Sequence, residues 1–279
     1  MIFGLGEKLP FDLAKNEIVV KQNQRTATRN IFKQRSILKK GVFMKTILHK
    51  ANTRGHANHG WLNSYHTFSF AGYYEPSRMN FGTLRVLNDD TVAGGMGFGK
   101  HPHDNMEIVS IPLSGDLEHN DTTGRHEIIK QGDVQIMSAG SGIQHSEKNA
   151  NHHQEVKFLQ IWVMPAKRNI EPRYEQKSFL PADRKNKLQT VVAPDDVEAV
   201  WINQNAWFSL GNLEKGVETN YHFHKKESGV YAFVLKGDVS INGIALNERD
   251  GLGITEIETL NITADSDAEL LLMEVPMKL

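Results

Sequence analysis

The sequence contains no cysteine, so disulfide bonds, thiolate catalysis and cysteine-ligated metal clusters are excluded. It also lacks any apolar run of the ~18 residues that a membrane-spanning helix needs, and no secretory signal stands at its start. The formal net charge of −1 gives no overall attraction to nucleic acid or to a membrane surface. These absences favour a globular, cytoplasmic protein, and they leave histidine and carboxylate side chains as metal ligands.

Histidine, by contrast, is abundant and unevenly placed. Ten of the 13 histidines lie between His56 and His153. With 279 residues, the chain is long enough for two small domains. The histidine distribution therefore indicates that the chemistry belongs to the first half of the chain, with a quieter second half.

Two short segments each hold two metal-binding side chains separated by one residue. His101 and His103 form the first pair, and His145 and Glu147 form the second. Side chains alternate between the two faces of a β-strand, so residues i and i+2 point the same way. Both pairs can therefore project into one barrel, where three imidazoles and a carboxylate leave two positions for solvent or substrate. Such a ligand set suits a mid-row divalent ion such as Fe(II), Ni, Cu or Zn.

Residues 1–43 differ in composition from the rest of the chain. They hold nine Lys and Arg residues against three Asp and Glu. The stretch 22–40 is polar, basic and without clear periodicity, so we predict a disordered leader over 1–43. It is either an over-extended start or expression remnant, or an organellar transit peptide, and its three acidic residues favour the first explanation.

From Met44 onward the sequence is typical of an all-β protein. Short apolar and β-branched stretches are separated by Gly, Asn and Asp, at the spacing of a barrel or sandwich. Turns are predicted at Asn88-Asp89-Asp90, 114–116 and 130–133, where turn-forming residues gather. Strands are predicted over 46–49, 83–87, 107–113, 133–137, 156–164, 206–210, 229–236, 239–241 and 270–275.

The pattern Gly-x5-His-x-His occurs at residues 95–103 and again at 216–224. A repeat of about 120 residues indicates a duplicated domain, because solenoid repeats have periods of ~20–50 residues. The second copy has no histidine after His224 and cannot complete a histidine-rich site from its own residues. The predicted units are a metal-binding domain over 44–165, a proline-containing linker over 166–185 and a degenerate domain over 186–279.

The two histidine segments together resemble the cupin signature. Its first half, Gly-x5-His-x-His-x(3,4)-Glu-x6-Gly, matches residues 95–115, with the last glycine one position late. Its second half, Gly-x5-Pro-x-Gly-x2-His-x3-Asn, matches residues 132–149, with two residues inserted and Ser138 in place of proline. The resemblance implies two cupin barrels, of the double-stranded β-helix or jelly-roll kind, packed together.

More narrowly, residues 44–279 resemble the pirin family of two-domain cupins, and most of all its bacterial members described as quercetin 2,3-dioxygenases. The resemblance implies that His101, His103, His145 and Glu147 hold the metal and that the second domain holds none. Iron is the first metal expected, with Ni, Cu, Co, Mn and Zn as alternatives. The segments that carry the resemblance are Arg54-Gly-His-Ala-Asn-His-Gly-Trp-Leu62, His66-Thr-Phe-Ser-Phe70, His101-Pro-His103, residues 135–147 and Pro172-Arg-Tyr-Glu-Gln176.

The activity that this resemblance implies is the opening of the heterocycle of a quercetin-like flavonol by O2, with loss of carbon monoxide. The flavonol would bind the metal through its 3-hydroxyl or the adjacent carbonyl, and Glu147 would accept the hydroxyl proton. Eukaryotic pirins are regarded as transcriptional co-regulators, so a non-catalytic, metal- or redox-sensing protein with a protein partner is the first alternative. A cupin enzyme acting on another phenol is the second. Neither direct nucleic-acid binding nor membrane association is expected.

Several further side chains have two interpretations. Glu107 shares the strand parity of His101 and His103, and it is either a ligand or, as we favour, a carboxylate that supports the ligands or has a structural role. The histidines at 56, 59 and 66 either line a pocket or, as favoured, hold the N-terminal segment over the barrel by hydrogen bonds.

The apolar residues around the motifs and the second His-x-His are also open to two interpretations. His222 and His224 form either a second site or, as favoured, a surface or relic pair, because a stable site needs further ligands. A set of apolar residues lines a pocket or, as is more common, fills the barrel core: Met96, Phe98, Met106, Phe158, Ile161 and Trp162.

Overall fold

The computed structural model describes residues 44–278, and the leader predicted over 1–43 lies outside them. The described chain consists of β-strands with three short 3-10 helices, so the predicted all-β class is confirmed. No helix within residues 44–278 is long and apolar enough to cross a membrane. The 3-10 helices are η1 (Ala51–Thr53), η2 (Pro76–Arg78) and η3 (Pro181–Arg184).

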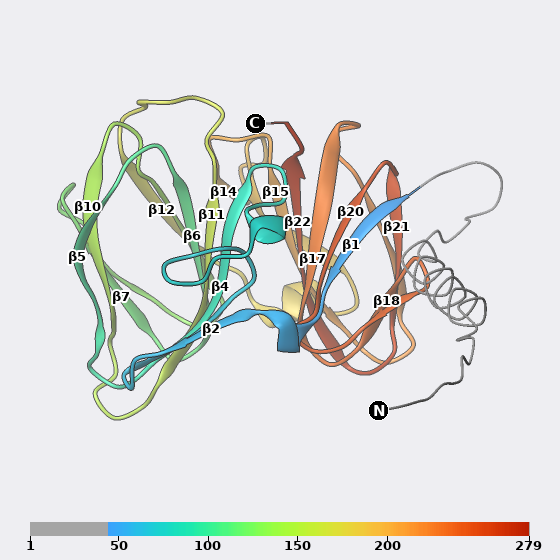
Figure 1. Cartoon of the computed structure of the whole chain (residues 1–279), viewed down its shortest axis with the longest axis horizontal. Helices are drawn as coiled ribbons and strands as arrows, with labels where there is room; N and C mark the ends of the chain where they lie inside the picture. Colours follow the sequence, from blue (N-terminus) through green and yellow to red (C-terminus); the bar gives the residue numbers. More distant parts are fainter. Residues whose placement is uncertain (1–43, 279) are drawn as a thin grey trace, which may run out of the picture. The chain divides into compact units, whose positions relative to one another are not determined.

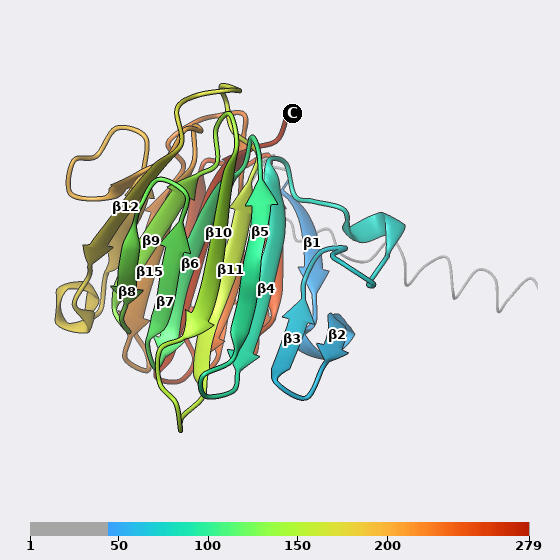
Figure 2. The ribbon, with the colours of Figure 1, turned by 90° about the vertical axis from the view of Figure 1, so that its left-hand side faces the viewer.

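The strands divide into two groups, which form the left and right halves of Figure 1; in Figure 2 the first group faces the viewer. The first group is β2 (Gly55–Asn58), β3 (Leu62–His66), β4 (Leu84–Val92), β5 (Gly97–His103), β6 (Glu107–Ser114), β7 (Leu117–Asp121), β8 (His126–Ile129), β9 (Asp133–Ser138), β10 (Ile143–Asn149), β11 (Val156–Val163) and β12 (Arg173–Ser178). The second group is β1 (Lys45–His49), β13 (Leu188–Ala193), β14 (Val200–Trp201), β15 (Trp207–Leu213), β16 (Glu218–His222), β17 (Ser228–Lys236), β18 (Val239–Ile241), β19 (Ile244–Leu246), β20 (Gly251–Thr255), β21 (Thr259–Ala264) and β22 (Ala268–Pro276).

Each group contains one seven-stranded and one four-stranded sheet. In the first barrel the large sheet has the order β12-β9-β6-β11-β4-β3-β2, and the small sheet has the order β5-β10-β7-β8. In the second barrel the corresponding orders are β1-β20-β17-β22-β15-β13-β14 and β16-β21-β18-β19. The two cupin domains predicted from the sequence are thus present as two sandwiches with matching strand orders.

The two seven-stranded sheets share one large apolar core. Leu159 and Ile161 of β11 belong to this core together with Phe233 of β17 and Met273 of β22. Successive side chains of a strand point to opposite faces, so the residues between them face the other way, into their own barrel. Each large sheet is therefore buried on both faces, one against the other barrel and one against its own interior.

Two strands belong to a different sheet from the one that the predicted domain boundaries imply. β1 pairs with β20 of the second barrel, from Lys45 opposite Thr255 to His49 opposite Gly251 (Figure 1). β12 pairs along its length with β9 of the first barrel. The boundaries predicted for the first domain, 44–165, therefore include a strand of the second sheet and omit a strand of the first.

The turn predicted at Asn88-Asp89-Asp90 is wrong, because all three residues lie within β4. The strand continues through them since Asn88 pairs with His66 and Asp90 pairs with Ser64 across β3. The turns predicted at 114–116 and 130–133 are confirmed, with glycines 115 and 132 at φ of 75° and 94°. These three residues are of types that favour turns, but here their side chains alternate between the two faces of a buried sheet.

Candidate metal centre

Three imidazoles meet between β5 and β10 of the small sheet in the first barrel. His101 and His103 alternate with the exposed Pro102 on β5, and His145 stands opposite His101 in the register of the two strands. The ring centroids are 4.9 Å apart for His101 and His103, 4.4 Å for His101 and His145, and 4.9 Å for His103 and His145. One nitrogen of each ring lies within 4.8 Å of the others, a spacing that suits a shared ion.

His103 and His145 are held in the neutral form that a metal requires. Burial, with the neighbouring imidazoles, lowers the pKa of His103 to about 4 and that of His145 to about 3. Nδ1 of His101 lies 2.7 Å from the carbonyl oxygen of Gly99, which leaves its Nε2 free to face the other rings. Both ring nitrogens of His145 are buried without a hydrogen-bond partner among the described residues. Buried polar atoms normally have partners, so this ring fits a metal ligand.

Glu147 lies beside this cluster on the same face of β10 as His145. It is 2% exposed. Its Oε1 accepts a hydrogen bond of 3.0 Å from Oγ of Ser110, and its Oε2 accepts one of 2.5 Å from Nε2 of Gln160. A carboxylate oxygen of Glu147 falls within 4.8 Å of ligand atoms of His145 and His119, in a group that overlaps the three-histidine cluster at His145.

The other candidate carboxylate, Glu107, lies elsewhere. It is fully buried at the start of β6, and its Oε2 accepts hydrogen bonds from Oγ of Ser138 at 2.7 Å and from the backbone N–H of Asn203 at 3.1 Å. Burial raises its pKa. Glu107 belongs to neither group of metal-binding side chains within residues 44–278. Its contact with Asn203 ties the first barrel to the second half of the chain, which is a structural role.

The sequence analysis missed His119 on β7. This residue is fully buried opposite Glu147, and its Nε2 lies 2.9 Å from Oδ2 of Asp121. Its ring centroid is 5.3 Å from that of His145 and 4.8 Å from that of Tyr174. His119 therefore fixes the buried side of the His145 ring. The alternation of Leu117, His119 and Asp121 along the sequence is the signal that could have found it, but no strand was predicted there.

A cavity of about 780 Å³ opens beside the imidazole cluster. His101 and Glu147 border it, and the edge-to-face pairs Trp61–Phe98 and Phe70–Trp162, each with ring centroids 5.4 Å apart, form much of its apolar wall. This volume is in the range of small-molecule sites. The full lining is His56, Ala57, His59, Trp61, Leu62, Ser64, His66, Phe70, Ala71, Gly72, Tyr73, Asn88, Asp90, Phe98, His101, Glu147, Gln160 and Trp162.

The lining of this cavity shows which of the candidate histidines and apolar residues in the first half of the chain border a pocket. The histidines at 56, 59 and 66 all border the cavity, so they line a pocket and the favoured alternative is wrong for the set. Nε2 of His56 does lie 2.6 Å from Oδ1 of Asn63, but Nδ1 of His66 has no hydrogen-bond partner among the described residues. Of the apolar candidates, Phe98 and Trp162 line the cavity. The remaining ones do not: Phe158 and Ile161 are core, Met106 packs against core residues, and Met96 is exposed.

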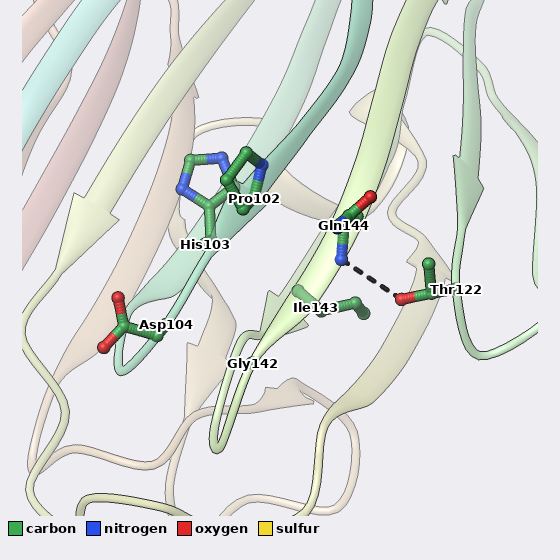
Figure 3. A pocket seen from close by; sticks show the side chains of 7 residues that line it. All are labelled: Pro102, His103, Asp104, Thr122, Gly142, Ile143 and Gln144. Carbon is green, nitrogen blue, oxygen red and sulfur yellow. Dashed lines mark hydrogen bonds between the residues drawn. The ribbon is translucent and has the colours of Figure 1, made fainter.

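A smaller depression of about 410 Å³ borders His103 on another side of the cluster (Figure 3). It lies between the end of β5 and the start of β10, where the backbone N–H of Gln144 donates a 3.1 Å hydrogen bond to Oγ1 of Thr122. The imidazole cluster therefore borders two cavities, the larger at His101 and the smaller at His103. The lining of the smaller one is Pro102, His103, Asp104, Thr122, Gly142, Ile143 and Gln144.

The second barrel places its histidines differently. Nδ1 of His222 lies 3.1 Å from Oγ1 of Thr259, and Nδ1 of His224 lies 2.9 Å from Oε2 of the fully buried Glu274. The ring of His224 also stacks on Trp207, with centroids 4.6 Å apart. Within residues 44–278, the groups of three potential ligands are confined to the first barrel.

Comparison with known proteins gives the same division of the chain. Residues 48–163 match the family model described as Pirin, and residues 190–275 match the model described as quercetinase C-terminal cupin domain. A quercetin 2,3-dioxygenase of Escherichia coli strain K12 is 46% identical over 230 residues, which cover 82% of this chain and 98% of that protein. A pirin-like protein of Caulobacter vibrioides is 42% identical over 222 residues, covering 79% and 95% of the two chains.

Solved structures agree with the sequence relatives. The crystal structure of the bacterial pirin YhhW from Escherichia coli in complex with nickel(II) is 44% identical and superposes with a TM-score of 0.79. The superposition covers 83% of this chain and 99% of that one. Because relatives above 40% identity match along nearly their whole length, this chain belongs to the pirin family of two-domain cupins.

Proposed function

We propose that this chain is a metal-dependent dioxygenase that opens the heterocycle of a quercetin-like flavonol with O2. The observation that carries the proposal is the junction of the three-histidine cluster with a large aromatic-walled cavity, which His101 and Glu147 both border. The relatives named quercetin 2,3-dioxygenase support this substrate class. A flat, three-ring substrate suits a cavity walled by Trp61, Phe98 and Trp162.

The metal would be held by His101, His103, His145 and Glu147. The neutral, unpartnered His145 ring and the spacing of the three imidazoles support this assignment. Iron, nickel and other mid-row divalent ions accept such donors, and the related YhhW is described in complex with nickel(II). When bound, the ion polarises a substrate oxygen as a Lewis acid and orients the reacting partners.

The side chains around the cluster would do the remaining work. Glu147 accepts the proton of the flavonol 3-hydroxyl, and the hydrogen bonds from Ser110 and Gln160 hold its carboxylate in a fixed orientation. The aromatic walls exclude water from the activated ring. Both atoms of O2 enter the product while one ring carbon leaves as carbon monoxide, so the flavonol is oxidised and O2 is reduced.

The test is single-turnover chemistry with protein of measured metal content. The protein is titrated with quercetin under anaerobic conditions, O2 is added, and carbon monoxide and the cleaved ester are quantified. We expect one carbon monoxide per bound metal, and none from the His101→Ala/His145→Ala variant at the same concentration. If the wild-type protein binds quercetin but returns it unchanged after O2, the chain is a non-catalytic pirin-type binding protein.

A further inference from the structure

A row of polar side chains crosses the interior face of the large sheet in the first barrel. The residues occupy one level of the sheet, since each pairs in register with the next across neighbouring strands. From β3 to β9 the row consists of His66, Asn88, Gln160, Ser110 and Gln135. The opposite face at this point is apolar core. A polar row at the centre of a barrel therefore needs a reason, because polar groups buried without partners are costly.

Part of the row is explained by Glu147. Ser110 and Gln160 both donate hydrogen bonds to its carboxylate. The end of the row nearest β3 has no such partner. Nδ1 of His66 and Oδ1 of Asn88 lack a hydrogen-bond partner among the described residues. Both residues are buried, with exposed fractions of 3% and 2%. An unmet polar requirement thus remains at this end of the row, as it does for the amide of Gln135 at the other end, which does not border the large cavity.

This end of the row faces the large cavity. His66, Asn88 and Gln160 all border it, and the hydrogen-bonded pair Ser64 and Asp90 borders it at the next level of the sheet. Neighbouring strands lie ~4.8 Å apart, so the two steps from Gln160 through Asn88 to His66 span roughly 10 Å. The cavity therefore has polar partners at the Glu147 end and again at a remote end, and its other walls are largely aromatic.

We propose that His66 and Asn88 form a remote subsite that binds a ring hydroxyl of an extended polyhydroxylated aromatic compound whose other end reaches His101 and Glu147. This inference rests on the proposed function, because it places the substrate in the same cavity. It narrows the substrate class, since a single-ring phenol cannot reach both ends. A hydroxyl group satisfies both orphaned atoms, because its proton is donated to the Asn88 carbonyl oxygen while its lone pair accepts the N–H of the His66 tautomer protonated at Nδ1.

A purely structural role for these residues predicts a different behaviour. A structural polar group is hydrogen-bonded within the protein, and its removal destabilises the fold. An orphaned polar group kept for a ligand does the reverse, because replacing it by an apolar side chain of similar shape removes an unmet requirement. Asn88→Leu should therefore leave the thermal midpoint of the protein unchanged or raise it while weakening the ligand.

The experiment compares two flavonols that share the metal-binding end. Quercetin carries hydroxyl groups on its other rings, and 3-hydroxyflavone lacks them. Anaerobic titrations follow the quenching of tryptophan fluorescence, which the cavity residues Trp61 and Trp162 report. The proteins are wild type, Asn88→Leu, His66→Phe and the control His126→Phe, which changes an exposed histidine on β8. All are compared at equal measured metal content.

We expect Asn88→Leu and His66→Phe to weaken quercetin binding at least about tenfold, the usual effect of leaving a buried hydroxyl unpaired. Binding of 3-hydroxyflavone should change less than about twofold, and the control should change neither. Equal losses for both flavonols, unchanged quercetin binding in both variants, or no quercetin binding by the wild type would each overturn the subsite. The proposed function fails separately, if O2 yields no carbon monoxide from a protein that still shows this selectivity.

Discussion

The two barrels of this chain have the same framework and opposite interiors. Their large sheets run in matching strand order, and β11 and β22 carry the same irregularity where they meet β6 and β17. This register makes Gln160 of the first barrel equivalent to Leu272 of the second, and Ser110 equivalent to Ala232. Gln160, Ser110 and Gln135 of the polar row are thus replaced by aliphatic side chains in the second barrel. Smaller hydroxyl residues, Ser209 and Thr190, stand at the positions of Asn88 and His66.

The same register explains what became of the second His-x-His. Trp162 of the first barrel, whose ring lies 4.9 Å from that of His103, corresponds to Glu274 in the second. Glu274 accepts hydrogen bonds from Nδ1 of His224 and from the hydroxyl of Tyr221, both at 2.9 Å. His224 thus has a carboxylate partner inside its own barrel, and within residues 44–278 it belongs to no group of three potential metal ligands. The comparison teaches that the two barrels differ in how their interior polar groups are paired, while the strand order stays the same. In the second barrel His224 and Tyr221 are hydrogen-bonded to a carboxylate of the same barrel.

The largest expected difference between the barrels is in metal content. His101→Ala/His145→Ala should abolish metal binding, because it removes two of three clustered imidazoles. His222→Ala/His224→Ala should leave the metal content at the wild-type value. Elemental analysis of purified, reconstituted protein measures both, and circular dichroism checks that the variants are folded. Loss of metal in the second variant would mean that the second barrel also binds metal.

The two buried glutamates of the first barrel should differ by orders of magnitude in catalysis. Glu147→Gln keeps the shape of the side chain but removes the proton acceptor, so flavonol cleavage per bound metal should fall by ~10²–10⁴-fold. Glu107→Gln should have little effect on that rate, because Ser138 and Asn203 already occupy its carboxylate. Single-turnover rates normalised to metal content measure the difference. The opposite ranking would exchange the roles of the two residues.

Exchanging the interior polarity of the barrels should change stability in opposite directions. Gln135 and Leu252 are equivalent, since they pair with Ser110 and Ala232. Both amide atoms of Gln135 are buried without a partner among the described residues, so Gln135→Leu should stabilise the protein by about 1–3 kcal/mol. Leu252→Gln should destabilise it by about 3 kcal/mol or more, because it buries an unmet amide and loses apolar burial. Urea denaturation of both variants tests this contrast.

The pH dependence of stability should also differ in sign. Burial raises the pKa of Asp90 in the first barrel to about 7, against 3.8 in the unfolded chain. Between these values the native state holds a proton that the unfolded state has lost, so this contribution to stability falls as pH rises from 4 to 7. Asp90→Asn should therefore be more stable than wild type at pH 8, by on the order of 2–4 kcal/mol, and similar near pH 4.

Glu274 in the second barrel provides the opposite case. Its burial acts to raise the pKa, but the hydrogen bonds from His224, Lys225 and Tyr221 outweigh burial and lower it. Its contribution to stability is therefore present above the pKa of an unfolded glutamate and is lost as pH falls through the lower native pKa. Glu274→Gln should cost stability at pH 7 and less at pH 3. Chemical denaturation at these pH values, beside Asp90→Asn, measures both slopes.

Much of the fold was predictable because its signals are local. The turns around Gly115 and Gly132 and most strands of both barrels follow from short apolar runs between turn residues. The pairing of His101 with His145 follows from strand alternation applied to two short motifs. The ligand candidates could therefore be chosen before their surroundings were known.

The sequence prediction failed where tertiary strand pairing outweighed the local turn preference of the residues around the cavity. Asn88-Asp89-Asp90 has turn composition, but tertiary pairing with β3 and β11 keeps it in a strand. Asn88 and Asp90 then point into the cavity, while Asp89 forms ion pairs with Arg54 and Arg249 on the other face. His119 was missed for a related reason. Its place beside the cluster depends on its contact with Asp121 and on the pairing of β7 with β10, which residue spacing alone does not predict.

The pairing of β1 with β20 has a consequence for how the chain is made. Lys45 lies opposite Thr255, so the first described strand must wait for a partner synthesised about two hundred residues later. At ~5–20 residues per second, this delay on the ribosome is roughly 10–40 seconds. During that time an edge strand with an unpaired backbone is exposed to other chains. Completion of the second barrel, and of the contact between Nδ1 of His49 and the hydroxyl of Tyr231 at 2.8 Å, is therefore a late, post-translational event.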